Sequence, residues 1–293
     1  MSATVRALLD YGIERFESAD ISYGHGTANA LDEAAWLVLH ALGLPPRNLN
    51  RYLEQVLTDS QAEAARSLID RRVKTRKPAA YLIHEAWLGA HRFYVDERVI
   101  VPRSFIAELL DRGRSGDRAG SDPATTPVSV LDLCTGSGCL AVLAALAFPK
   151  AKVDGADLSQ EALEVAKRNV AEYQLQDRVR LVKSDLFGAL EGRTYDFIVS
   201  NPPYVKAASM RKLPDEYRKE PVMALASGAD GLDHTRTIIA EAKAHLNPGG
   251  KLWVEIGHNR KALERAYPKL AFKWPRTSGA KGYVFELKRE DLP

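Results

Sequence analysis

The chain has 293 residues, which is enough for one large and one small domain at about 100–200 residues per domain. With 41 Lys and Arg against 38 Asp and Glu, the formal net charge of +3 is too small to predict nucleic-acid binding from bulk charge. The two cysteines exclude a disulfide framework and a four-cysteine metal site, and the seven histidines show no metal-binding spacing.

The beginning of the chain lacks the basic and apolar regions of a secretory signal. Its longest apolar run, residues 139–148, is far shorter than the roughly 20 residues that span a bilayer. We therefore expect a cytoplasmic protein with no membrane partner and no bound metal.

The first 79 residues are expected to form a small helical domain. The third predicted helix begins near Ser60 and ends before Pro78. Apolar side chains recur at helical spacing in three stretches, residues 5–16, 34–42 and 62–73. No catalytic constellation is visible in this part of the chain.

A β-hairpin is expected to link this domain to the rest of the chain over residues 80–104. Short alternating runs at 87–95 and 99–101, with a turn between them, are typical of a hairpin. A short helix is predicted at 105–110. Residues 111–127 are rich in Gly, Asp, Ser, Thr and Pro and predict a mobile surface loop.

From residue 128 onward, predicted strands and helices alternate, which is typical of a parallel sheet covered on both faces. The expected strands are residues 128–133, 152–156, 179–183, 197–200, 251–256, 271–274 and 283–287. The expected helices are residues 138–148, 159–173, 234–246 and 261–267. The last two strands should pair as a hairpin. The prediction is an α/β protein with a doubly wound, mostly parallel, seven-stranded sheet that ends in an antiparallel hairpin.

A glycine-rich loop joins the first of these strands to its helix. It contains five candidate cofactor-binding residues, Cys134, Thr135, Gly136, Ser137 and Gly138. Glycines let the backbone turn tightly there, and the following helix N-terminus offers unpaired N–H donors. Because Gly136 to Ala141 also fits the G-x-G-x-x-A pattern of nicotinamide sites, the loop alone cannot choose between NAD and S-adenosylmethionine.

Three aspartates stand at the ends of three successive strands. Asp157 follows the second strand, where a carboxylate accepts hydrogen bonds from ribose hydroxyls. Asp185 follows the third and could accept from an adenine amino group, with Leu186 beside the ring. Asp132 precedes the glycine loop, near the expected methionine end of the cofactor. Each could also be a helix cap or turn residue, but together they favour a ligand site.

The sequence Asn201-Pro202-Pro203-Tyr204 follows a buried-strand pattern and carries the candidate catalytic residues. An amide nitrogen is a poor nucleophile, because its lone pair is delocalised into the carbonyl. A site that methylates it needs acceptors for both N–H groups, so that the lone pair points at the methyl group. The Asn201 side-chain oxygen and the Pro202 carbonyl, in a loop stiffened by two prolines, can be those acceptors, and Tyr204 can stack on the amide.

These residues together resemble the glutamine methyltransferases of the HemK/PrmC/PrmB family over essentially the whole chain. The family features, besides the glycine loop and residues 201–204, are residues 100–103 (Ile-Val-Pro-Arg), 220–221 (Glu-Pro), 224–225 (Ala-Leu) and 227–232 (Ser-Gly-Ala-Asp-Gly-Leu). The resemblance implies that S-adenosylmethionine is the cofactor, held by residues 134–138, Asp157 and Leu186. It also implies a substrate-recognition domain at 1–79, a hairpin linker at 80–104 and a methyltransferase domain at 105–293.

Within the family, the chain is similar to the branch that methylates a glutamine of the third large-subunit ribosomal protein. Residues 22–29 (Ser-Tyr-Gly-His-Gly-Thr-Ala-Asn), the continuation Ser104-Phe105-Ile106 after Arg103, and the pair Cys134 and Cys139 carry that likeness. The other branch methylates the Gly-Gly-Gln motif of peptide release factors, so a release factor remains the alternative protein partner.

Three further interpretations stay open. A nucleic-acid exocyclic-amine methyltransferase could use the same Asn-Pro-Pro-Tyr loop, because a flipped base amine poses the same geometric problem. A nicotinamide oxidoreductase would leave that loop without a task. A non-catalytic ribosome-assembly module would explain the basic run at 71–77, which is either a solvated helix end or a contact to ribosomal RNA.

Overall fold

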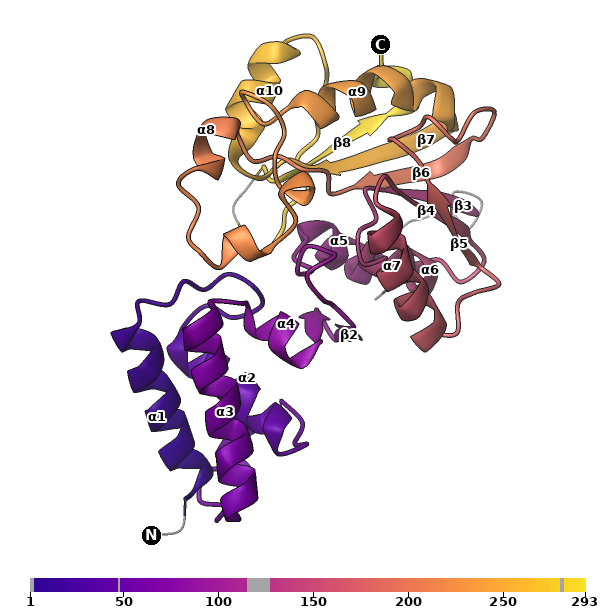
Figure 1. Ribbon diagram of the computed structural model, residues 1–293. Helices are drawn as coiled ribbons and strands as arrows, with labels where there is room; N and C mark the ends of the chain where they lie inside the picture. Colours follow the sequence, from indigo (N-terminus) through magenta and orange to yellow (C-terminus); the bar gives the residue numbers. More distant parts are fainter. Residues whose placement is uncertain (1–2, 47, 115–126, 280–281) are drawn as a thin grey trace.

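The computed structural model describes residues 3–46, 48–114, 127–279 and 282–293. Its N-terminal part is helical, as predicted, and stands apart from the sheet in Figure 1. Its helices are α1 (Val5–Ser18), α2 (Ala30–Ala41), α3 (Asp59–Thr75) and the short α4 (Ala79–Ile83). Side chains of Thr4, Asn29 and Thr58 accept the first free N–H groups of α1, α2 and α3, which fixes where each helix begins.

The predicted link differs in detail from what the sequence suggested. It begins with α4, and only β1 (Ala86–Leu88) and β2 (His91–Phe93) pair as a hairpin. The run 99–101 is not a strand, because Val101 donates its N–H to the Glu220 side chain at 3.0 Å instead of to a neighbouring strand. Helix α5 (Phe105–Arg114) continues through the first residues of the predicted loop at 111–127, and residues 115–126 lie outside the described part.

The large sheet has six strands in the order β5-β4-β3-β6-β7-β8 among the described residues, all parallel except β8. They are β3 (Ser129–Leu133), β4 (Lys152–Asp157), β5 (Val179–Lys183), β6 (Tyr195–Ser200), β7 (Leu246–Glu255) and β8 (Val284–Lys288). The doubly wound, mostly parallel sheet with an antiparallel end is thereby confirmed, with six strands in the described residues instead of seven. The predicted seventh strand at 271–274 is reduced to one bridge between Lys273 and Glu286, since Pro275 has no N–H to continue the pairing.

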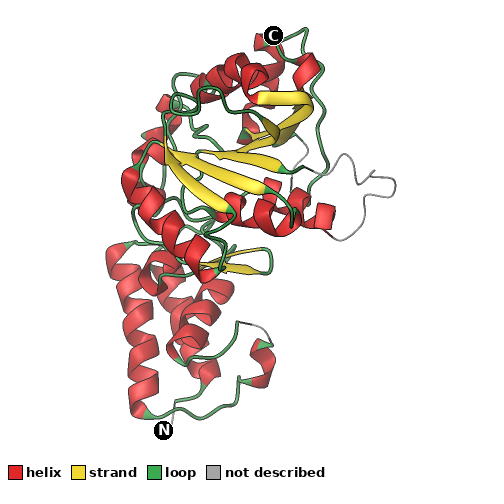
Figure 2. Cartoon of the chain, turned by 90° about the vertical axis from the view of Figure 1, so that its right-hand side faces the viewer, coloured by secondary structure: helices red, strands yellow, loops and turns green. Residues whose placement is uncertain are grey.

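Helices cover both faces of this sheet (Figure 2). Side chains alternate along each strand, so Val130 and Phe197 pack with α5 and α6 on one face, whereas Leu131 and Ile198 pack with the C-terminal helices on the other. The covering helices are α5, α6 (Cys139–Ala147), α7 (Gln160–Glu172), α9 (Asp233–Glu241) and α10 (Arg260–Ala266). A four-residue helix, α8 (Ala207–Met210), lies in the segment after β6. Across the described ranges, no helix combines the length and apolarity needed to cross a membrane.

Candidate active site

The glycine-rich loop lies at the carboxyl end of β3 and is held from the neighbouring strand. Cys134, Gly136 and Gly138 have φ angles of 58°, 54° and 76°, so the backbone runs through the left-handed region three times. A side chain at Gly138 would meet the Cα of Ala166 at 3.2 Å, which requires glycine where α6 passes α7. Asp157, at the end of β4, accepts the N–H groups of Gly136 at 2.8 Å and Ser159 at 2.9 Å. The loop is therefore fixed in one shape.

Asp132 lies beneath this loop rather than on its open side. Its side chain is fully buried, and its Oδ2 accepts the Thr135 hydroxyl at 2.5 Å. Its Oδ1 has no hydrogen-bond partner among the described residues. Burial raises the pKa of Asp132 to about 7. Thr135 and Ser137 are also buried, so three of the predicted cofactor contacts support the loop from below.

A cavity of about 280 Å³, here called the Asp157 cavity, opens above the loop. Seven of the predicted site residues line it, namely Cys134, Gly136, Asp157, Asp185, Leu186, Asn201 and Pro203. Leu158 and His234, which the sequence did not single out, line it as well. Carboxylates and leucines therefore face one enclosed space, as a nucleoside-containing ligand requires.

The Asn-Pro-Pro-Tyr loop follows β6 and separates two cavities. Asn201 lines the Asp157 cavity and also a second cavity of about 270 Å³, here called the Pro202 cavity, which includes Pro202 and Tyr204. The Asn201 Nδ2 lies 3.4 Å from the Arg103 carbonyl oxygen and donates to it, while its buried Oδ1 has no partner among the residues described. An unpaired buried acceptor is costly, so this oxygen is available to a ligand that brings a donor.

The position of Tyr204 is fixed by its backbone and its ring. Its carbonyl accepts the Asn259 side-chain N–H at 2.8 Å. A side chain at Gly257 would approach the Tyr204 ring to 2.8 Å, so the ring needs glycine beside it. Burial raises the pKa of the Tyr204 phenol, which therefore stays neutral. The ring can pack on a planar group in the Pro202 cavity without bringing a charge there.

Comparison with known proteins bears on this arrangement. Residues 7–83 match the PrmC N-terminal domain and residues 123–216 the methyltransferase small domain. The ribosomal protein uL3 glutamine methyltransferase of Neisseria meningitidis serogroup B is 53% identical over 289 residues, covering 99% of this chain and 94% of the relative. That of Bradyrhizobium diazoefficiens is 48% identical and covers 96% and 89%. The chain belongs to the family of the ribosomal protein uL3 glutamine methyltransferases.

Membership in the family confirms the predicted enzyme class, a methyltransferase, and overrules the nicotinamide and non-catalytic interpretations. A solved structure of the hMettl16 catalytic domain in complex with MAT2A 3'UTR hairpin 1 superimposes with a TM-score of 0.52. The superposition covers 89% of this chain and 93% of the hMettl16 chain, and the two sequences are 16% identical. This likeness shows a shared fold alone.

An ion pair between partly buried Arg103 and fully buried Glu220 lies beside Asn201 and was not predicted from the sequence. The Nη1 and Nη2 of Arg103 donate to the Oε1 and Oε2 of Glu220, each at 2.6 Å. Burial opposes the charge of Glu220, yet Arg103 lowers its pKa to about 2. His25, fully buried in the N-terminal helical part, places its Nε2 3.5 Å from the Glu220 carboxylate. Arg103 and Glu220 were each visible as part of a family feature, but the sequence did not show that these residues, 117 positions apart, pair with each other.

A second buried network corrects the interpretation of the basic run at 71–77. Arg72 is fully buried and donates to Glu33 at 2.5 Å, and its Nη1 lies 3.5 Å from Glu216. Arg76 lies 2.7 Å from Glu216. These two cations therefore join the helical part to the segment that carries Glu220; Arg72 is shielded from solvent, and Arg76 is partly exposed. Arg71 and Lys74 remain exposed.

Proposed function

We propose that this chain transfers a methyl group from S-adenosylmethionine to the side-chain amide nitrogen of a glutamine in ribosomal protein uL3. The observation that carries the proposal is the buried Oδ1 of Asn201, which has no hydrogen-bond partner in the described part of the chain and lies at the boundary of two cavities. One cavity suits the cofactor and the other suits a planar amide. The names of the curated relatives support uL3 as the acceptor.

The Asp157 cavity fits S-adenosylmethionine. Each oxygen of Asp157 accepts one backbone N–H and keeps a second lone pair for a ribose hydroxyl. Asp185 would accept from the adenine amino group, and Leu158 and Leu186 would flank its ring. When bound, S-adenosylmethionine supplies an electrophilic methyl group on a sulfonium. The backbone of Cys134 and Gly136 would border the methionine end.

The Pro202 cavity would hold the acceptor amide. Asn201 Oδ1 and the Pro202 carbonyl would each accept one of its N–H groups, which turns the nitrogen lone pair toward the methyl group. Pro203 stiffens the loop, so this geometry needs little rearrangement during the reaction. Tyr204 would pack against the flat face of the amide. The new N–C bond would form as the bond between the methyl group and the cofactor sulfur breaks, which leaves a neutral thioether, and the amide nitrogen would release one proton to water.

In this proposal, residues 1–79 recognise the acceptor protein and residues 105–293 carry out the transfer. Residues 80–104 link these two domains. A ribosomal acceptor places the reaction in the cytoplasm. Exposed Arg71 and Lys74 are the candidates for a ribosomal RNA contact, if the acceptor is an assembly intermediate.

The test is mass spectrometry of ribosomal proteins and release factors from cells with and without the gene. We expect uL3 alone to lose one methyl group, located on a glutamine. A loss on a release factor, or on neither, would overturn the proposed acceptor. Purified chain, uL3 and labelled S-adenosylmethionine should reproduce the transfer, and a methylated nucleic acid instead would contradict the class of acceptor.

A further inference from the structure

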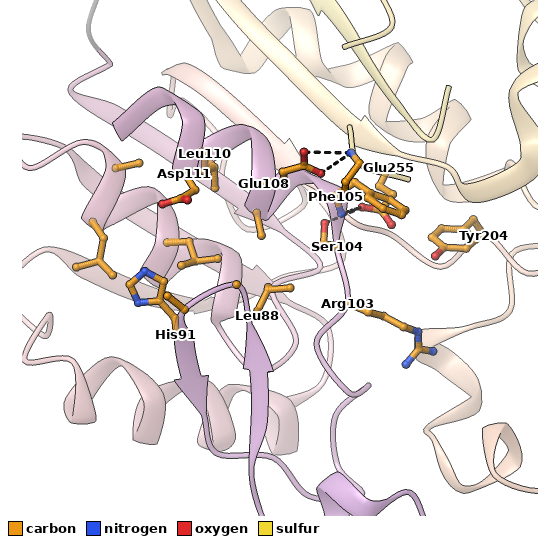
Figure 3. Close-up of a pocket in the computed structure, with 17 residues that line it drawn as sticks. Leu88, His91, Arg103, Ser104, Phe105, Glu108, Leu110, Asp111, Tyr204 and Glu255 are labelled. Carbon is orange, nitrogen blue, oxygen red and sulfur yellow. Dashed lines mark hydrogen bonds between the residues drawn. The ribbon is translucent and has the colours of Figure 1, made fainter. Parts of the chain in front are cut away.

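A third and larger cavity lies beside the Pro202 cavity and has no part in the chemistry described so far (Figure 3). Its volume is about 530 Å³, within the roughly 300–1,000 Å³ of ligand sites. We call it the Leu146 cavity. The turn of the β1–β2 hairpin, α5 and the end of α6 enclose this cavity. Its apolar lining residues are Leu88, Ala90, Ala107, Leu110, Leu143, Leu146 and Ala147.

One wall is common to the Leu146 and Pro202 cavities. It consists of the four residues Arg103, Phe105, Tyr204 and Glu255. No described residue lines both the Leu146 cavity and the Asp157 cavity. The three spaces therefore follow one another, with the cofactor at one end, the acceptor amide in the middle and the Leu146 cavity at the other end.

Arg103, Glu255 and Glu108, which line the Leu146 cavity, are already hydrogen-bonded within the protein, and the other titratable lining residues, Asp111 and His91, have interactions of their own. Glu220 holds Arg103, and Glu255 accepts the Ser104 hydroxyl at 2.7 Å and the Phe105 N–H at 2.9 Å. Glu108 accepts the Ser278 N–H at 2.7 Å and binds Arg112. A charged ligand group would be desolvated there without a new partner, whereas an apolar group gains from the leucines.

We propose that the Leu146 cavity binds an apolar side chain of the acceptor protein, a few residues from its methylated glutamine in sequence. This rests on the proposed function, because a glutamine in the Pro202 cavity brings its neighbours along. The flanking polypeptide can leave on this side without meeting the cofactor. The shared wall then sets how far the apolar residue stands from the glutamine, which makes the Leu146 cavity a specificity site.

The test combines a filled cavity with changes in the acceptor. Ala147→Trp on the half-buried end of α6 should fill the space, and Ala90→Trp at the exposed hairpin turn is a second filler should the first fail to fold. Ala171→Trp, at an exposed position of α7 that lines none of these three cavities, is the matched control. Acceptors are uL3 and its variants with each apolar residue near the methylated glutamine replaced by alanine.

For the unmodified chain and the Ala171→Trp control, we expect the KM for one of these uL3 variants to be about tenfold to a hundredfold higher than the KM for uL3 itself. With a filled cavity, uL3 itself should show the raised KM, and the same replacement should add little. Affinity for S-adenosylmethionine should not change. If every replacement costs the same in filled and unfilled chains, another ligand or none occupies the cavity and the proposal fails. If uL3 is never methylated, the proposed function fails instead.

Discussion

The two sides of Asn201 are built in different ways. The cofactor side consists of the ends of three neighbouring strands, and its residues follow short runs such as the glycine loop and the acid after β4. The acceptor side is assembled from His25, Arg103, Glu220 and Glu255, which are far apart in sequence. One side can be altered locally, whereas the other depends on the packing of the helical part. Changes on the acceptor side should therefore affect stability as well as turnover.

The largest effect is expected from Glu220→Ala. Removing this carboxylate leaves the Arg103 guanidinium mostly buried and unpaired, which should lower the free energy of unfolding by about 3–5 kcal/mol. Urea unfolding measures it. Glu54→Ala is the control, because Glu54 and Arg6 form an exposed ion pair that should contribute less than about 1 kcal/mol. Equal losses for both variants would show that the Arg103–Glu220 pair does not hold the acceptor side together.

Asn201→Ala should reduce turnover rather than stability. Loss of one preorganised hydrogen-bonding group typically lowers kcat by roughly 10²–10³-fold, and affinity for S-adenosylmethionine should change much less. Asn201→Asp keeps an acceptor oxygen and should retain more activity than the alanine variant. Single-turnover methylation of uL3 measures the rate of the chemical step, and calorimetry measures the affinity for S-adenosylmethionine separately. Unchanged turnover in Asn201→Ala would remove the central element of the proposed mechanism.

The same contrast explains how much could be read from the sequence. The sheet, the glycine loop and the Asn-Pro-Pro-Tyr turn have local signals, namely alternating apolar runs, glycine and proline. The ion pairs of Arg72 and Arg103 have none, because a buried arginine and an exposed one look alike in a sequence. Asp132 shows the reverse case. Its place before the loop suggested a ligand contact, but whether a side chain points up or down at a strand end depends on strand register.

The buried Asp132, on the cofactor side, should make the free energy of unfolding depend on pH. Its folded-state pKa is raised by burial to about 7, above the 3.8 of an ordinary aspartate, so the folded state binds the proton more tightly. Its contribution to stability is complete below about pH 4 and is lost as the pH rises toward 7, by at most about 1.4 kcal/mol per pH unit. Asp132→Asn should remove the part of the slope that Asp132 contributes and leave the part due to Glu255, whose pKa is also raised by burial to about 7. Unfolding followed from pH 5 to 8 checks it, and an unchanged slope would assign it to another group.

The smallest effect is expected from Asp157→Asn, which acts within the cofactor side alone. An amide has one oxygen where the carboxylate has two, so it cannot accept from Gly136, Ser159 and a ribose together. We expect the Kd for S-adenosylmethionine to rise about tenfold, the cost of one hydrogen bond to a charged group. The KM for uL3 should change little, whereas the free energy of unfolding should fall by about 1 kcal/mol, because one of the two backbone N–H groups that Asp157 holds loses its acceptor. If the KM for uL3 rose as much as the Kd for the cofactor, the two sides would be coupled through Asn201 and the loop could not be treated as a fixed partition.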